Sequence, residues 1–481
     1  MRRISLPPSS RRSQPPGPSA LRSVVKVLTV SDAPDYEQPW QTRGAISSSG
    51  SGALVQTNRG LRVLTNAHVV ENQVFVEVRR YGNSTKYVAE VEGVGHECDL
   101  ALLRVEQEEF YGGAEPLVCG PLPALGTRVK VLGYPIGGER LSVTEGVVSR
   151  IEVSPYAQTQ RSLLAIQLDA AINSGSSGGP VFKDDRLIGV AFQSLEEGEN
   201  ISYAIAAPVV QHFLKDIEDG IFDGFPDLGI TWQPLEAASH RKQLGLSAKG
   251  GGILVTGVVY QGSAWRKLRE GDAILEIDGV PIARDGTVAL RPGELVDLSY
   301  VVAQRQVGER MDAVIWRSGT QRRVGLHLTA PKRLVPEDRY DVRPSYFIYG
   351  GLVFVPLTRD YLKSWGDDWQ HAAPHHLMAL HDYGLRRRDR LEVVILMKVL
   401  ADRANQGYHE LENLVVTHVN GVKIRSLREV IQLIDAGKGA FTTIATAQGR
   451  QIVLDADLAR QRHAAVLARY HVPSDRSDDL L

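Results

Sequence analysis

The sequence has very little cysteine: Cys98 and Cys119 are the two cysteines among 481 residues. Two thiols cannot supply the disulfide network that stabilises many small secreted domains, so we expect the fold to rest on buried apolar cores. This cysteine usage fits a reducing compartment. As a thiol nucleophile Cys98 is a weak candidate, because no glycine turn exposes it, and we expect it to be structural.

The chain also lacks an excess of charge of either sign and lacks long apolar runs. Lysine and arginine total 55, aspartate and glutamate total 56, and the formal net charge is −1. No global basic field is present to attract nucleic acid, and we interpret the basic run Arg386–Arg390 as a solvated face. The apolar run 391–400 is far shorter than the ~20 residues that span a bilayer. We therefore expect neither a nucleic-acid partner nor a membrane span.

The first 31 residues contain no acidic residue and are rich in arginine, serine and proline. Such a composition is also found in organellar transit segments, which remain an alternative. The prolines exclude a continuous amphipathic helix, and the apolar stretch of a secretory signal is absent. We predict a disordered basic tail over 1–23 and a cytoplasmic location, with an organelle or the nucleus as the alternative if the source is eukaryotic.

Short apolar runs separated by glycine, serine and asparagine fill the chain from Val24 to about Ile221. Many short strands with glycine-rich turns over ~200 residues indicate a β-sandwich or a pair of β-barrels. Residues 207–218 carry apolar side chains at helical spacing after Pro208, which predicts a helix that closes this region.

Two later segments share a pattern in which a Gly-Gly-apolar run is followed by an Asx-Gly turn. The first has Asp278-Gly279 at its turn, and the second has Asn420-Gly421. Both dipeptides predict hairpins, because both turn positions tolerate a positive φ. The second copy carries an insertion over much of Tyr361–Arg403, which we expect to pack against the chain itself or a neighbouring subunit.

Three motifs with candidate catalytic residues appear in the order His68, Asp99, Ser177. A serine hydroxyl becomes a nucleophile when a neutral imidazole accepts its proton, and a carboxylate must hold that imidazole in the correct tautomer. Taken singly, each motif has a plainer interpretation as a core histidine, a turn or a loop. Ser176 is the rival nucleophile, but the glycine pair that permits a tight turn directly follows Ser177.

With these motifs the chain resembles the Deg/HtrA family of trypsin-like serine proteases, in particular the plant-type branch with one PDZ domain and a divergent second one. The segments that carry the resemblance beyond the triad are Gly133–Gly138, Ser142–Arg150, Asp169–Asn173, Pro344–Phe354 and Pro473–Leu480. The resemblance implies a mainly β fold: a chymotrypsin-like double β-barrel protease domain (24–222) followed by two PDZ-like α+β domains (223–332 and 333–481).

The resemblance implies that His68, Asp99 and Ser177 form the triad and that the backbone of Gly175, Ser176 and Ser177 forms the oxyanion hole. The chain departs from the family pattern at Ser174, where the family has proline, and at Ser176, where it has asparagine. A missing proline loosens a loop, so we expect low basal activity.

The resemblance also places Ile172 at the primary specificity pocket, with Phe192 and Ile201 as further lining residues. An apolar pocket predicts cleavage after small or medium aliphatic residues, and plain core packing is the alternative. Three glutamates at 196, 197 and 199 form an acidic loop, interpreted as a solvated turn with a gating loop as the alternative.

In the first PDZ-like copy, the run Gly251, Gly252, Ile253, Leu254 and Val255 resembles a PDZ carboxylate-binding loop, where a peptide adds as a strand. An ordinary hairpin without a ligand is the alternative. We expect the second copy to be architectural.

We therefore predict a serine endopeptidase that cleaves unfolded or damaged proteins, without a metal or other cofactor. The resemblance implies homo-oligomers, either trimers or multiples of trimers. The alternative function is a catalytically weak or inactive peptide-binding scaffold for protein quality control.

Overall fold

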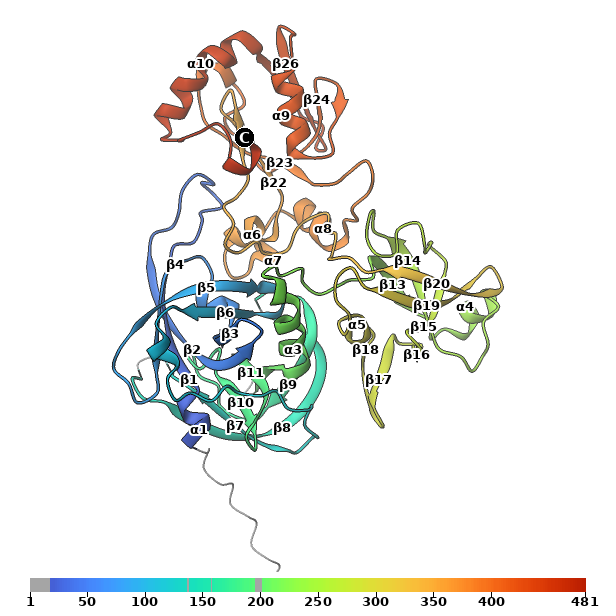
Figure 1. The fold of residues 1–481 in the computed structure, drawn as a ribbon. Coiled ribbons are helices and arrows are strands. Elements are labelled where there is room, and N and C mark those ends of the chain that lie inside the picture. The colour runs from blue at the N-terminus through green and yellow to red at the C-terminus, as the bar shows by residue number, and fades with distance from the viewer. Residues whose placement is uncertain (1–17, 136–137, 157, 195–200) are drawn as a thin grey trace, which may run out of the picture.

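Two closed six-stranded antiparallel barrels precede two smaller α+β units (Figure 1). The computed structural model describes residues 18–135, 138–156, 158–194 and 201–481. Within them, none of the helices combines the length and apolar character that crossing a membrane requires. This architecture confirms the predicted mainly β fold, with a double barrel followed by two PDZ-like units.

The first barrel closes in the order β1-β2-β3-β6-β5-β4. Its buried core is made of aliphatic side chains together with Phe110. Its elements are β1 (Val24–Ser31), β2 (Ile46–Thr57), β3 (Gly60–Thr65), α2 (Ala67–Val70), β4 (Gln73–Arg80), β5 (Tyr87–Gly95), the 3-10 helix η1 (His96–Cys98), β6 (Leu100–Val105) and the 3-10 helix η2 (Glu108–Tyr111).

The second barrel closes in the order β10-β11-β12-β9-β8-β7. The helix predicted after Pro208 is confirmed: α3 (Ala207–Asp216) follows the last strand directly. The other elements are β7 (Arg128–Gly133), β8 (Ser142–Pro155), β9 (Ser162–Leu168), β10 (Pro180–Lys183), β11 (Arg186–Ser194), β12 (Ser202–Ala206) and the 3-10 helix η3 (Ile217–Asp219).

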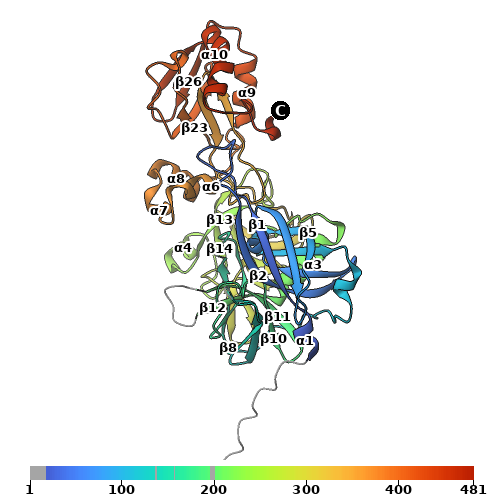
Figure 2. The same cartoon turned by 90° about the vertical axis from the view of Figure 1, so that its left-hand side faces the viewer.

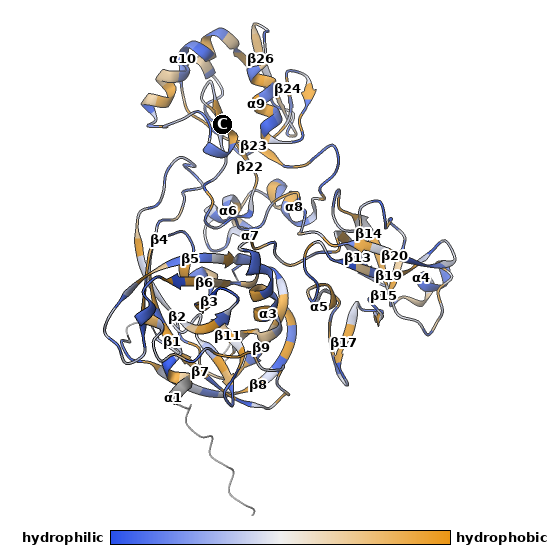
Figure 3. Cartoon of the chain, viewed as in Figure 1, coloured by the Kyte–Doolittle hydropathy of each residue, from blue (hydrophilic) through white to orange (hydrophobic). Residues whose placement is uncertain are grey.

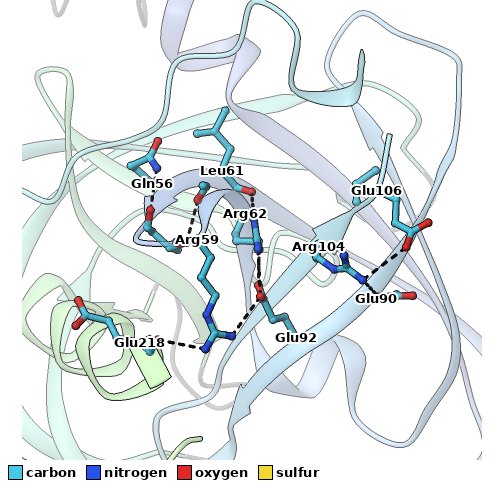
Figure 4. Close-up of polar contacts among 12 residues, drawn as sticks. Gln56, Arg59, Leu61, Arg62, Glu90, Glu92, Arg104, Glu106 and Glu218 are labelled. Carbon is cyan, nitrogen blue, oxygen red and sulfur yellow. Dashed lines mark hydrogen bonds and ion pairs between the residues drawn. The ribbon is translucent and has the colours of Figure 1, made fainter. Parts of the chain in front are cut away.

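Charged side chains tie the first barrel to the end of the second (Figure 4). Arg62 on β3 pairs with Glu92 on β5, and Arg59 reaches the same carboxylate at 3.5 Å. Arg59 also donates to the backbone carbonyl of Glu218 in η3 at 3.2 Å. The Arg62–Glu92 pair lies within the first barrel, and the bond from Arg59 to Glu218 is the contact of this network that reaches η3.

PDZ-like domain 1 is a sheet in the order β13-β14-β15-β19-β20, and it packs beside the second barrel. Along β19 buried and more exposed positions alternate, and strands throughout the chain mix apolar with polar residues (Figure 3). Its elements are β13 (Ile230–Pro234), α4 (Ala238–Gln243), β14 (Ile253–Val258), β15 (Ala273–Ile277), β16 (Val280–Pro281), β17 (Thr287–Arg291), β18 (Glu294–Asp297), α5 (Ser299–Val302), β19 (Arg310–Arg317) and β20 (Thr320–His327).

PDZ-like domain 2 is built on a sheet in the order β21-β22-β23-β24-β26-β27. Helices α6, α7 and α8 lie between this sheet and the barrels in both views (Figures 1 and 2). The elements are β21 (Phe347–Tyr349), β22 (Leu352–Pro356), α6 (Arg359–Leu362), η4 (Lys363–Trp365), α7 (Trp369–Ala372), α8 (His375–Tyr383), β23 (Val394–Val399), η5 (Arg403–Asn405), β24 (Leu414–Val419), β25 (Val422–Lys423), α9 (Leu427–Asp435), β26 (Phe441–Thr446), β27 (Gln451–Asp455), α10 (Ala456–Arg469) and η6 (Asp478–Leu480).

Both predicted hairpin turns are present. Asp278 and Gly279 have φ of 46° and 79°, and Asn420 and Gly421 have φ of 50° and 78°. The insertion of domain 2 packs against domain 1, where the Tyr260 N–H donates to the Arg386 carbonyl at 3.1 Å.

One predicted boundary differs. The predicted disordered tail includes residues 18–23, but α1 (Pro18–Arg22) is helical there. Ala20 is buried against the barrel, and Arg80 donates to the carbonyl of Arg22 at 3.2 Å. Tertiary contacts therefore order this short piece, while residues 1–17 of the predicted tail lie outside the described part of the chain.

Candidate active site

His68 and Asp99 form a two-point contact between α2 and the segment after η1. The Nδ1 of His68 lies 2.7 Å from Oδ2 of Asp99, and the His68 backbone N–H donates to Oδ1 at 2.9 Å. Asp99 is buried to 1% exposure, whereas the imidazole keeps 18% of its surface accessible. A buried carboxylate bonded to Nδ1 leaves Nε2 as the proton-accepting nitrogen.

The backbone of Asp99 is itself held in place. Asp99 has a left-handed conformation with φ of 53° at the end of η1, and its N–H donates to the His96 carbonyl at 3.0 Å. Its carbonyl accepts a hydrogen bond from Nδ2 of Asn66 at 2.7 Å. These contacts fix the carboxylate relative to α2, which begins directly after Asn66.

The loop that carries Ser177 packs against the same segment. Gly178 has φ of 82°, and a Cβ there would lie 2.0 Å from the Ser51 carbonyl oxygen and 2.5 Å from Thr65 Oγ1. The Ser177 carbonyl accepts the N–H of Ser51 at 2.8 Å. Glycine is required at 178 because a Cβ would clash with these atoms. The close approach places Ser177 beside the residues that precede His68.

Hydrogen bonds inside the loop decide which N–H groups are available to a ligand. The Ser176 N–H donates to the Asn173 carbonyl at 2.9 Å, and the Ser176 carbonyl accepts from Gly179 at 2.9 Å. Among the described residues, the N–H groups of Gly175 and Ser177 have no hydrogen-bond acceptor. The inclusion of the Ser176 N–H in the oxyanion hole is therefore corrected, because that donor is already used within the loop.

The Gly175 carbonyl is bonded to a hydroxyl of the first barrel. Oγ of Ser51 donates to the Gly175 carbonyl at 2.8 Å, and Ser51 Oγ in turn accepts the Tyr134 N–H at 2.8 Å. Within the described chain, no hydrogen bond joins Ser177 Oγ to His68 Nε2. Catalytic hydrogen bonds are often long without substrate and shorten when the substrate binds.

Charges around His68 affect its proton affinity. Burial opposes protonation, but the Asp99 carboxylate outweighs this effect, and the pKa of His68 is raised above its ordinary value. Glu71, at the end of α2, is largely buried, and this burial raises its pKa to about 7. Burial also raises the pKa of the Cys98 thiol well above its usual range, which agrees with a structural role for that cysteine.

Known proteins match the chain along most of its length. Residues 50–190 match the trypsin-like peptidase domain family, and residues 335–479 match the PDZ domain family. Protease Do-like 2, chloroplastic, of Arabidopsis thaliana is 40% identical over 96% of this chain and 76% of its own length. The chain belongs to the Deg/HtrA family of serine proteases. Protease Do-like 4, mitochondrial, of Arabidopsis thaliana is 36% identical over 96% of this chain and 86% of its own length.

A solved structure shares the fold of this Deg/HtrA chain. The HtrA-type protease AlgW, determined with a decapeptide, is 24% identical with a TM-score of 0.50 and covers 65% of this chain and 97% of its own.

The predicted specificity residues of this Deg/HtrA protease lie at the core of the second barrel. Ile172 and Phe192 are buried, and Ile201 is half-buried against the same cluster. Phe192 packs on Tyr156 with ring centroids 4.5 Å apart. Their assignment to a specificity pocket stays a prediction, and the acidic residues 196, 197 and 199 lie outside the described residues.

The predicted peptide site in domain 1 is wrong as placed. The strand β14, which contains Ile253, Leu254 and Val255, pairs with β13 on one side and β15 on the other, so it has no free edge for a peptide. In the preceding loop the Gly252 N–H already donates to the Ile282 carbonyl at 2.8 Å, and a Cβ on Gly251 would lie 1.9 Å from that same oxygen. This loop therefore packs inside the domain.

The strand β13 is the edge that the sequence analysis missed. Among the described strands it pairs with β14 alone. A cavity of about 670 Å³ runs beside it, lined by Ile230 and Thr231 together with Leu334, Val335 and Tyr383 of the following segments. The sequence signal was the short run Leu228-Gly229-Ile230, in which Gly229 has φ of 68° directly before the strand.

Proposed function

We propose that Ser177, His68 and Asp99 carry out peptide hydrolysis in this Deg/HtrA protease through an acyl-enzyme. The observation that carries the proposal is the two-point bond between His68 and Asp99 beside the glycine turn at Ser177. Nε2 of His68 takes the Ser177 proton as Oγ attacks the substrate carbonyl carbon, and then gives that proton to the leaving amine. Water repeats the sequence and releases the acid.

The N–H groups of Gly175 and Ser177 stabilise the oxyanion. The Ser51 hydroxyl fixes the stretch of loop between these two donors, because it bonds to the Gly175 carbonyl. Loss of one oxyanion donor typically costs about 10²- to 10³-fold in kcat.

We further propose unfolded or damaged protein chains as substrates and a trimer, or a multiple of trimers, as the assembly. Both rest on membership of the Deg/HtrA family. We also propose that domain 1 holds a peptide that adds as a strand along β13, because the 670 Å³ cavity leaves room beside that edge. The cytoplasmic location stays a proposal.

A fluorophosphonate probe with mass mapping of the modified residue tests the catalytic assignment. We expect modification of Ser177 in the wild type and in Ser176→Ala, and none in Ser177→Ala. The wild type and Ser176→Ala should also degrade casein, and Ser177→Ala should not. Absence of label on Ser177 after heating and after addition of peptides would contradict the proposal.

The second candidate is a peptide-binding scaffold with weak or no turnover. The missing bond between Ser177 Oγ and His68 Nε2 in the described chain, with serine at 174 and 176, favours it. It predicts that wild type and Ser177→Ala degrade casein equally slowly while both bind peptides.

A further inference from the structure

A carboxylate from domain 2 reaches the protease barrels beside the catalytic pair. Asp341 lies in the segment between β20 and β21. Its Oδ2 lies 2.7 Å from Nε2 of His96, and its Oδ1 accepts the Asn72 N–H at 2.5 Å. The Asp341 N–H returns a bond to Oδ1 of Asn72 at 3.1 Å. One residue thus contacts two separate segments of the first barrel.

Those two segments carry the two catalytic partners. Asn72 comes shortly after α2, which contains His68. His96 is the first residue of η1, and its carbonyl accepts the N–H of Asp99. Fixing Asn72 to His96 through a single carboxylate therefore limits how far the imidazole of His68 and the carboxylate of Asp99 can separate.

Further contacts show that this is a built interface. The ring of Tyr340 packs on the His96 ring with centroids 4.7 Å apart, and its hydroxyl donates to the Gln158 carbonyl at 2.8 Å. Asn72 and Asp341 both have a positive φ, 51° and 60°. Asparagine and aspartate adopt this backbone conformation more readily than most residues, so the contact needs no unusual strain.

Glu71, a half-buried acid, interacts electrostatically with both sets of residues. Oε2 of Glu71 has no hydrogen-bond partner among the described residues. The charged groups that face it are His68 and Asp99 from the catalytic pair, and His96 and Asp341 from the interface. Burial first, and then the carboxylates of Asp99 and Asp341, raise the pKa of Glu71, while both imidazoles lower it. The charge of Asp341 therefore affects Glu71, the residue that directly follows α2.

We propose that Asp341 is a positioning residue for catalysis: by joining Asn72 to His96 it holds His68 and Asp99 at their bonding distance, so that docking of domain 2 sets the reactivity of Ser177. This inference rests on the proposed catalytic function of the triad. It gives domain 2 a part in the chemistry itself, beyond the architectural role expected from its sequence.

The test compares D341N and H96Q with the matched control D368N in the full-length chain. Asp368 is an exposed carboxylate of the same domain that contacts His371, so its change leaves the interface intact. The first readout is the rate of fluorophosphonate labelling of Ser177 as a function of pH. The second is the pKa of His68, followed through the NMR signal of its ring.

We expect D341N to label about tenfold more slowly, a size typical of coupling between sites. The midpoint of its acid limb should move to lower pH, because a looser contact with the Asp99 carboxylate raises the pKa of His68 less. H96Q should also slow labelling, and the double variant should be no slower than the slower single variant, since both act through one contact. D368N should match the wild type.

Wild-type labelling rate and wild-type His68 pKa in D341N would overturn the inference, as would effects of D341N and H96Q that multiply. Circular dichroism and a melting curve identify a variant that has merely unfolded, and H96Q then tests the same contact from the other side. If even the wild type is not labelled, the proposed function fails, while the NMR readout still decides whether Asp341 acts on His68.

Discussion

The Cα of Gly178 sits so close to Ser51 that a methyl group on it would lie 2.0 Å from the Ser51 carbonyl oxygen. This contact brings the nucleophile loop against the first barrel, and it depends on a φ of 82° that other residues rarely adopt. The turn at Ser177 is therefore built by an approach between two barrels and not by the loop alone.

Gly178→Ala should inactivate the enzyme by moving this loop. The positive φ alone costs ~1–2 kcal/mol, and the clash with backbone adds to that cost. Gly126→Ala is the matched control, because Gly126 has φ of 74° and nothing within 4 Å of its would-be Cβ. Fluorophosphonate labelling should be lost in Gly178→Ala and kept in Gly126→Ala. Equal labelling in both would mean that the close approach is unimportant.

Asp99→Asn should lower kcat by about 10⁴-fold, because an amide that donates to Nδ1 forces the wrong tautomer on His68. Peptide binding to domain 1 should stay unchanged, since Asp99 is buried at the junction of α2 and η1. The measurement is steady-state cleavage of a short chromogenic peptide, with peptide affinity determined separately. A small change in kcat with a large change in KM would argue against the tautomer role.

The two hairpin turns and the candidate triad could be predicted from the sequence, because short local motifs specify them. The turns at Asp278-Gly279 and Asn420-Gly421 were found because their two residues specify the conformation. The candidate triad was found in the same way, from a glycine turn after Ser177 and a histidine and an aspartate in the expected order.

Long-range pairing limited the rest. Gly251–Val255 has the local pattern of a peptide-binding strand, but whether a strand lies at an edge depends on β13, which pairs with it across a separate stretch of chain. The contact between Asp341 and His96 joins two residues whose sequence neighbourhoods carry no sign of each other. The helix at Pro18–Arg22 was missed because packing on the barrel, and not propensity, orders it.

Glu71→Gln should shift the acid limb of the pH–rate profile to lower pH. Only neutral His68 accepts the Ser177 proton, so the rate falls as pH drops through the raised pKa of His68. The charge of Glu71 helps to raise that pKa, and glutamine removes the charge while keeping the size. Labelling rates measured against pH locate the midpoint, with Glu77→Gln on β4 as a control of similar chemistry. An unchanged or higher midpoint would show that Glu71 does not act on His68.

Because β13 is an edge strand, we expect a bound peptide to slow amide hydrogen exchange in β13 of domain 1. A peptide with an apolar C-terminal residue should slow the exchange of outward-facing amides within Ile230–Pro234, because those groups have no strand partner before binding. Amides of β14 should not change, since that strand is already paired on both sides. The other edge of the sheet, β20, serves as an internal control within the same experiment. Protection confined to β20, or spread equally over all strands, would contradict the assignment, because the cavity of 670 Å³ lies beside β13.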